Sequence, residues 1–399
     1  MIKRILYTLL IMFPVVASAQ INTDRVMAIG RNALYFEDYV LSIQYFNQVI
    51  NAKPYLSDPY FYRGLAKINL DDFQGAESDC SEAIERNPFV VSAYQVRGLA
   101  RIQQNNFAGA IEDYTKALEF DPENIGVWHN MALCRIRQED YKGAKNDLDK
   151  LIAISPRYTK AYLMRGEVDL KQKDTLAAEK DFGKAIEIDR YDADTWASRA
   201  ILRLQQQRYK DAEADFDHAI RLSTRNSGVY INRALARYHQ NNLRGAMSDY
   251  DIALDIDPNN FIGHYNRGLL RAQVGDDNRA IQDFNFVIEM EPDNMMAIFN
   301  RGLLLDQTGD YKGAIKDYST VINEYPNFLL GYQYRAQARR KIGDVKGADA
   351  DEFKVLKAQL DKQNGVDPNK QTADNTENNK TRKKSDKNMN NYRKIVVAD

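Results

Sequence analysis

The chain has 399 residues, of which 44% are apolar, 11% aromatic and 28% charged, with two cysteines, four histidines and a formal net charge of -1. This composition excludes wholesale disorder, because there is ample apolar material to bury. The near-neutral charge argues against a dedicated nucleic-acid binder, which would carry a basic field. The few cysteines and histidines leave little for a transition-metal site.

The first 19 residues have the features of a secretory signal peptide. Lys3 and Arg4 precede an apolar stretch, Ile5 to Val16, and Ala17-Ser18-Ala19 then supplies the small residues that signal peptidase accepts. The stretch is shorter than the roughly 20 residues that span a bilayer, which disfavours a membrane anchor. We therefore expect residues 1–19 to be cleaved. The mature protein would be exported to the periplasm, the cell envelope or the medium, with no further transmembrane span.

The rest of the chain repeats every 34 residues. Arg-Gly pairs begin at Arg63, Arg97, Arg165, Arg267 and Arg301, separated by multiples of that period. With Thr23 as position 1, ten gapless repeats follow: 23–56, 57–90, 91–124, 125–158, 159–192, 193–226, 227–260, 261–294, 295–328 and 329–362.

Each position within the repeat has a consistent chemistry. Positions 8 and 20 are small, as in Gly166 and Ala178. Positions 4 and 24 usually carry a large ring, as in Tyr162 and Phe182, and position 32 is usually proline, as in Pro156. Small residues allow two helices to approach closely, rings fill the space beside them, and proline ends the second helix.

These positions on a 34-residue period resemble the tetratricopeptide repeat (TPR), a helix–turn–helix unit. The resemblance implies an all-α fold, a right-handed α-solenoid of about ten such units stabilised by stacking of neighbours. The last repeat is expected to act as a cap, since Asp349, Asp351 and Glu352 make its second helix polar. Cys80 and Cys134 fall in different repeats, and we expect both to be buried and unpaired.

Residues 363–399 are expected to form a polar, disordered tail or linker, because asparagine, lysine and threonine dominate them. Its basic residues are interpreted as a solvated linker in preference to an anionic-surface contact. The exception is Ile395-Val396-Val397, which has the character of a strand or docking motif. It is either a short recognition peptide or the start of a domain that is missing from this sequence.

Two charged columns accompany the repeats. Arginine occupies position 7, as in Arg233, and aspartate occupies position 23, as in Asp249. Their near one-to-one ratio favours a structural ladder over an anion-binding stripe. We expect each pair to join the second helix of one repeat to the first helix of the next.

The TPR resemblance implies a concave groove lined by one face of the first helices. The predicted groove residues are Phe61, Leu65, Gln95, Leu99, His129, Leu133, Leu163, Ile231, Leu235, Tyr265, Leu269, Phe299 and Leu303, with the position-6 asparagines Asn130, Asn232, Asn266 and Asn300. One interpretation is that this apolar stripe receives an amphipathic or extended apolar segment of a partner, whose backbone the asparagines hydrogen-bond. The alternative is that many of these residues pack on neighbouring helices. The family's carboxylate clamp, which needs lysine and asparagine at positions 5 and 9, is not supported.

The sequence contains no phosphate-binding glycine loop, no His-Glu zinc helix and no nucleophile-elbow serine. We therefore predict a non-enzymatic adaptor or scaffold without cofactor or metal. Its partner would be another exported or envelope protein, and no nucleic acid is expected. Alternative functions are a module that binds cell-wall glycan or peptide, or the interaction domain of a larger envelope protein.

Overall fold

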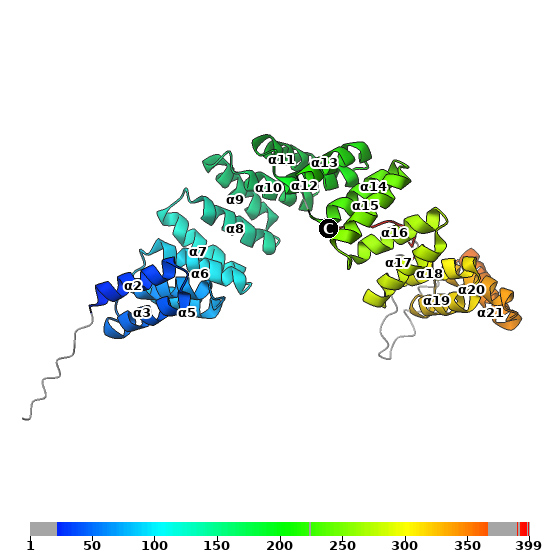
Figure 1. Cartoon of the computed structure of the whole chain (residues 1–399), viewed down its shortest axis with the longest axis horizontal. Coiled ribbons are helices and arrows are strands. Elements are labelled where there is room, and N and C mark those ends of the chain that lie inside the picture. Colours follow the sequence, from blue (N-terminus) through cyan, green and yellow to red (C-terminus); the bar gives the residue numbers. More distant parts are fainter. Residues whose placement is uncertain (1–21, 223–224, 366–388, 390–391, 397, 399) are drawn as a thin grey trace, which may run out of the picture. The chain divides into compact units, whose positions relative to one another are not determined.

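A computed structural model of the protein describes residues 22–222, 225–365, 389, 392–396 and 398. The expected signal peptide, residues 1–19, lies outside the described residues. The described part contains 20 helices and no strand, and it divides into two compact units, up to Ile188 and from Asp189 onward. Figure 1 shows the helices of each unit running as successive antiparallel pairs.

The N-terminal unit contains five helix pairs. They are α2 (Thr23–Tyr35) with α3 (Tyr39–Ala52), α4 (Asp58–Ile68) with α5 (Phe73–Arg86), α6 (Val91–Gln103) with α7 (Phe107–Phe120), α8 (Ile125–Arg137) with α9 (Tyr141–Ile154), and α10 (Thr159–Lys171) with α11 (Thr175–Ile188).

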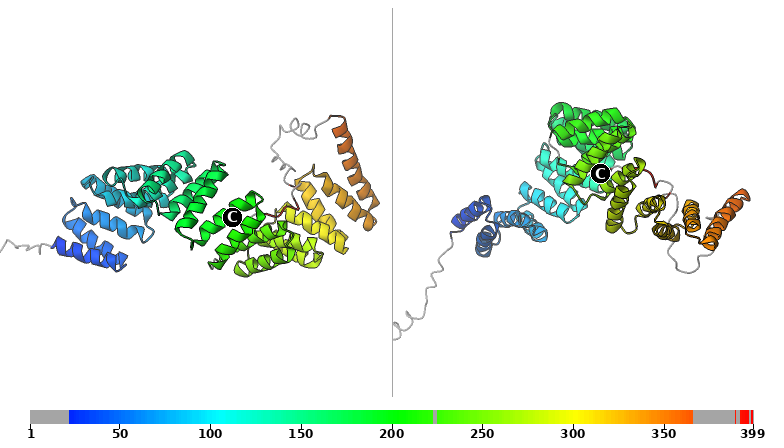
Figure 2. Two further views of the ribbon diagram at one scale, coloured as in Figure 1. Left: turned by 90° about the horizontal axis from the view of Figure 1, so that it is seen from above. Right: turned by 45° about the vertical axis from the view of Figure 1, so that its right-hand side comes forward.

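The C-terminal unit also contains five pairs, which Figure 2 shows from two further directions. They are α12 (Ala193–Gln205) with α13 (Tyr209–Arg221), α14 (Ser227–His239) with α15 (Leu243–Ile256), α16 (Phe261–Gln273) with α17 (Asp277–Met290), α18 (Met295–Thr308) with α19 (Tyr311–Glu324), and α20 (Leu329–Lys341) with α21 (Val345–Gln363). The fold is therefore the all-α TPR-type solenoid that the period predicts.

The turn between paired helices follows the 34-residue period. Position 15 has a positive φ in all ten repeats, from Glu37 (63°) to Gly343 (82°), and this left-handed residue ends the first helix. Position 16 then caps the second helix in most repeats. Asp140, for example, accepts a hydrogen bond at 3.0 Å from the main-chain N–H of Gly143.

Small residues set the crossing of each helix pair, as the sequence predicts. A Cβ atom added to Gly166 of α10 would lie 2.5 Å from the Phe182 ring of α11, and one added to Gly302 would lie 2.9 Å from the Tyr318 ring. The position-20 alanines, such as Ala178, are completely buried. Both cysteines are buried and free, which confirms that expectation.

The last repeat differs from the expected polar cap. Asp351 is only 3% exposed, because it pairs with Arg335 and Arg339 of α20. Conversely, Phe353 and Leu356 of α21 are exposed. The outer face of the final helix therefore carries apolar as well as polar side chains. Asp351, one of the acidic residues that indicated a polar face, is buried.

Candidate functional site

The candidate site is the line of asparagines at position 6 in the C-terminal unit. Asn232 lies on α14, Asn266 on α16 and Asn300 on α18, and each is at most 5% exposed. All three hydrogen-bond the main chain of the same segment, which comprises the described residues between 389 and 398. Figure 1 shows that end lying beside α14 to α16. We call this line of residues the asparagine ladder.

Two members of the ladder form reciprocal pairs with the segment. The side-chain amide of Asn266 donates to the Val396 carbonyl at 2.7 Å, and its oxygen accepts from the Val396 N–H at 2.8 Å. Asn232 makes the same two bonds with Ala398, at 2.7 and 2.9 Å. One repeat of the solenoid thus corresponds to two residues of the segment, which is the period of extended backbone. These bonds involve no side chain of the segment.

The spacing along the segment is longer between the residues that Asn300 and Asn266 contact. Asn300 donates to the Tyr392 carbonyl at 2.5 Å, and the Tyr265 hydroxyl donates to the same oxygen at 2.7 Å. Four residues, not two, separate Tyr392 from Val396. Burial raises the pKa of Tyr265, although its hydrogen bond with Asn300 opposes the shift, so the phenol stays a neutral donor.

Apolar side chains of the segment fill the groove between the asparagines. Ile395 is 8% exposed and belongs to the hydrophobic cluster that includes Leu235. The Tyr392 ring meets Phe299 edge-on, with centroids 4.8 Å apart. Met389 is 1% exposed in the cluster around Phe299, so its side chain also anchors the segment.

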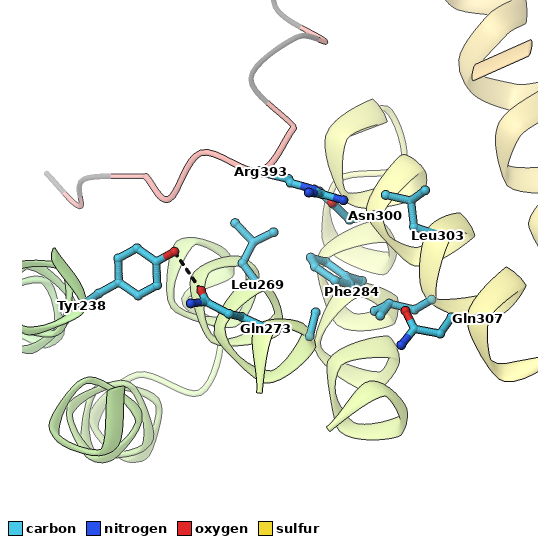
Figure 3. A pocket seen from close by; sticks show the side chains of 10 residues that line it. Tyr238, Leu269, Gln273, Phe284, Asn300, Leu303, Gln307 and Arg393 are labelled. Atoms are coloured by element: carbon cyan, nitrogen blue, oxygen red, sulfur yellow. Dashed lines mark hydrogen bonds between the residues drawn. The ribbon is translucent and has the colours of Figure 1, made fainter. Parts of the chain in front are cut away.

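A pocket of about 460 Å³ lies under the longer step of the ladder. Leu269, Leu303 and Phe284 contribute apolar walls, and Gln273 and Gln307 contribute amides. In Figure 3, Arg393 of the segment lies at the rim beside Asn300, and the Tyr238 hydroxyl bonds the Gln273 oxygen, at 2.8 Å. The docked segment therefore crosses this pocket without filling it.

The structure places the predicted groove residues of the C-terminal unit together, but most of them are covered. Ile231, Leu235, Tyr265 and Phe299 are at most 4% exposed, whereas Leu269 and Leu303 are partly exposed. These side chains pack on neighbouring helices and on the docked segment of the same chain. Their contact with a partner protein stays a prediction.

The N-terminal unit offers a different surface. Of its predicted groove residues, Leu99 is exposed and the others are partly exposed; these are Phe61, Leu65, Gln95, His129, Asn130, Leu133 and Leu163. His129, Leu133 and Met164 line an open pocket of about 500 Å³ on α8 and α10. Burial, together with Lys160, lowers the pKa of His129. Asn130 is the one asparagine at position 6 in this unit, so a ladder is confined to the other unit.

The charged columns form a structural network, but the predicted pairing was wrong. Arg233 binds Asp249 of its own repeat through two bonds, at 2.6 and 3.0 Å. Positions 7 and 23 face each other across one hairpin, so the pair joins the two helices of a single repeat. A third bond, from Arg233 to Asp217 at 2.7 Å, provides the link to the preceding repeat.

A second basic column, at position 11, was missed by the sequence reasoning. Arg237 binds Asp249 at 2.8 Å and also Glu213 of the preceding repeat at 2.8 Å. The contact with the position-23 aspartate recurs in other repeats, namely Lys67 with Asp79, Arg101 with Asp113, Arg135 with Asp147, Arg203 with Asp215, Arg271 with Asp283, and Arg339 with Asp351. Most of these aspartates thus have two cations, not one. A tally of basic residues at position 11 would have found them.

The position-7 arginines are poorly placed to bind an anion. Their side chains are between 11% and 23% exposed. Several also lie over the position-4 ring, as Arg199 does over Trp196 at 5.0 Å. Their hydrogen-bonding groups are directed at aspartates, so the two columns stabilise the fold.

Within the described residues, no group of three or more histidine, cysteine, aspartate or glutamate side chains is placed to hold a metal ion. Among the described helices, none combines the length and the apolar content that a membrane span requires.

Comparison with known proteins agrees with the helical-repeat class. Models described as "Tetratricopeptide repeat" match residues 125–158, 159–192, 198–261 and 265–327, and one described as "TPR repeat" matches residues 98–134. The chain is a member of the tetratricopeptide-repeat family. No curated protein matched it.

The chain is also similar to solved structures at low sequence identity. The C-terminal part of a TPR repeat-containing protein from Cytophaga hutchinsonii is 18% identical with a TM-score of 0.50, covering 59% of this chain and 97% of its own. A tetratricopeptide repeat protein from Parabacteroides merdae is 21% identical with a TM-score of 0.48, covering 62% and 98%. YrrB, described as a TPR protein with an unusual peptide-binding site, is 20% identical with a TM-score of 0.39, covering 46% and 95%.

Proposed function

We propose that this protein is a non-enzymatic scaffold whose C-terminal unit binds an extended segment of a partner protein. The observation that carries the proposal is the pair of reciprocal hydrogen bonds that Asn266 and Asn232 make with main-chain groups two residues apart. Main-chain bonds of this kind supply affinity for any extended backbone, and the apolar sites between them select side chains.

The partner is an exported or envelope protein if residues 1–19 act as the predicted signal. That location rests on Lys3, Arg4, the apolar stretch and the Ala17-Ser18-Ala19 site alone. The alternative of a glycan-binding module is disfavoured by the position of the tyrosines. Tyr114, Tyr250 and Tyr318 at position 24 are buried between helices, where a sugar cannot stack on them.

The test is capture of binding partners from the envelope fraction by the full chain and by an Asn232→Ala/Asn266→Ala variant. Proteins that bind the groove are retained by the wild type and lost from the variant. Retention of the same proteins by both would contradict the assignment of the ladder as the partner site. An Asn130→Ala variant, altered at the same position of a repeat in the other unit, serves as the matched control.

A further inference from the structure

We infer that the C-terminal segment is an internal copy of the ligand, and that the partner segment displacing it has an apolar residue at every third position, the last one small. This inference rests on the proposed function and names the chemistry of the partner. It makes the groove a site that is closed by its own chain until a matching segment competes.

The three-residue spacing comes from the side chains that the groove accepts. Met389, Tyr392, Ile395 and Ala398 are separated by three residues each, and all four are buried or partly buried. Arg393, Lys394 and Val396, between them, are exposed. An ordinary strand on a half-buried surface would instead bury every second residue. The pattern therefore differs from that of simple β-addition and is specific enough to test.

The groove sets the size limit at each end of the pattern. Ala398 is 3% exposed in a cluster with Ile231, Tyr250 and Leu270, which are themselves completely buried, so a large side chain has no room there. At the other end, the Phe299 and Phe328 rings meet edge-on with centroids 5.0 Å apart, in the cluster that also holds Met389. Aromatic rings and a methionine side chain pack well together, so this end favours a large apolar residue.

Attachment to the same chain explains why the segment holds the groove. Because the segment and the groove belong to the same chain, docking of the segment is intramolecular, and its effective concentration at the groove is high. A partner peptide must compete with that concentration. The pocket under the segment gives the partner a means to do so, because the segment leaves it unfilled.

Two substitutions at adjacent residues separate the buried and exposed sides of the segment. Ile395→Asp places a charge in the hydrophobic cluster and is expected to release the segment. Lys394→Asp introduces the same side chain at an exposed residue, and is expected to leave the segment docked. Neither residue belongs to a solenoid helix, so circular dichroism of both full-length variants should match the wild type.

The experiment measures binding of a fluorescent peptide with the sequence of residues 389–399 to the full chain. The Ile395→Asp protein is expected to bind it at least tenfold more tightly than the wild type or the Lys394→Asp protein. Exchanging Lys394 and Ile395 within the peptide keeps its composition but breaks the spacing, and is expected to weaken binding at least tenfold.

The possible failures are distinguishable. Equal, tight binding of the peptide to the wild type and to the Ile395→Asp protein would contradict the inference that the segment competes for the groove. The groove would remain a peptide-binding site. Equal binding of the two peptides would overturn the three-residue pattern. Absence of binding to every protein would contradict the proposed function as well. Sedimentation equilibrium tests whether two copies exchange their segments. A wild-type mass that doubles with concentration, together with a monomeric Ile395→Asp protein, would show such exchange and contradict closure within one chain.

Discussion

Asn266 and Val396 are 130 residues apart in the chain, yet they exchange two hydrogen bonds, at 2.7 and 2.8 Å. The asparagine side chain imitates a neighbouring strand at this point, since it presents one donor and one acceptor to the main chain. Repetition of the same residue at 34-residue intervals extends this recognition along the groove.

Asn266→Ala is expected to release the segment. The variant loses two partly buried hydrogen bonds, each contributing about 1 kcal/mol net, so amide exchange at Val396 should accelerate by roughly tenfold or more. Hydrogen exchange measured by NMR checks this. Asn130→Ala is the control and should leave that amide unchanged, and an unchanged rate in Asn266→Ala would contradict the ladder.

A charge-swapped contact supports a double-mutant test of the network between repeats. The Lys145 ammonium lies 2.5 Å from the buried carboxylate of Asp169. In two other repeats the charges are exchanged. Arg101 and Arg237 stand at the position of Asp169, and each binds a glutamate at the position of Lys145. Lys145→Glu or Asp169→Arg alone places like charges together and should destabilise the protein by about 2–4 kcal/mol. The double variant recreates the arrangement of the other repeats and should recover most of that loss in urea unfolding. Additive losses would contradict the pairing.

Asp147 is expected to make stability depend on pH. Its repeat has Met131 at position 7, so Arg135 is its single arginine partner in the ladder, and burial raises the pKa of Asp147 to about 6. The folded pKa lies above the value of about 3.9 in an unfolded chain, so ionisation is a penalty above pH 6 that disappears as the pH falls toward 4.

The comparison with Asp147→Asn isolates this contribution. The free energy of unfolding of the wild type, minus that of the variant, should rise by about 1–3 kcal/mol between pH 7.5 and pH 4.5. Urea unfolding at several pH values measures it. A difference that stays constant, or falls as the solution is acidified, would contradict the raised pKa.

Tyr250→Phe is expected to stabilise the protein. The Tyr250 hydroxyl is buried and has no hydrogen-bond partner among the described residues, whereas Phe182, Phe216 and Phe284 occupy the same position in other repeats. Removing a buried, unsatisfied hydroxyl should gain about 1 kcal/mol, visible as a higher midpoint in thermal unfolding. A lower midpoint would show that the hydroxyl is bonded in solution.

Much of the fold could be predicted because the period repeats each physical constraint ten times. Gly166 and Phe182 show how: a small residue and a ring, 16 positions apart, indicate a close helix crossing that the structure confirms. The pairing of position 7 with position 23 was predicted to join two repeats, but Arg233 and Asp249 pair within one repeat. The prediction failed because spacing along the chain does not reveal which of two adjacent helices a side chain faces.

The sequence indicated both parts of the site but not the contact between them. Asn232, Asn266 and Asn300 were predicted to bond a backbone, and Ile395-Val396-Val397 was noted separately as a docking motif. Nothing local connects the two, because contacts between distant segments depend on where the solenoid places its groove. The joint pattern became apparent only when the structure placed Val396 against Asn266.

The most direct test of the groove as a competitive peptide site is hydrogen exchange at the Val396 and Ala398 amides of the full-length wild type, with and without an excess of peptide 389–399 carrying a heavy-isotope label. We predict slow exchange without peptide and at least tenfold faster exchange when the peptide saturates the groove. Fast exchange in the absence of peptide, or protection that saturating peptide does not change, would contradict the account.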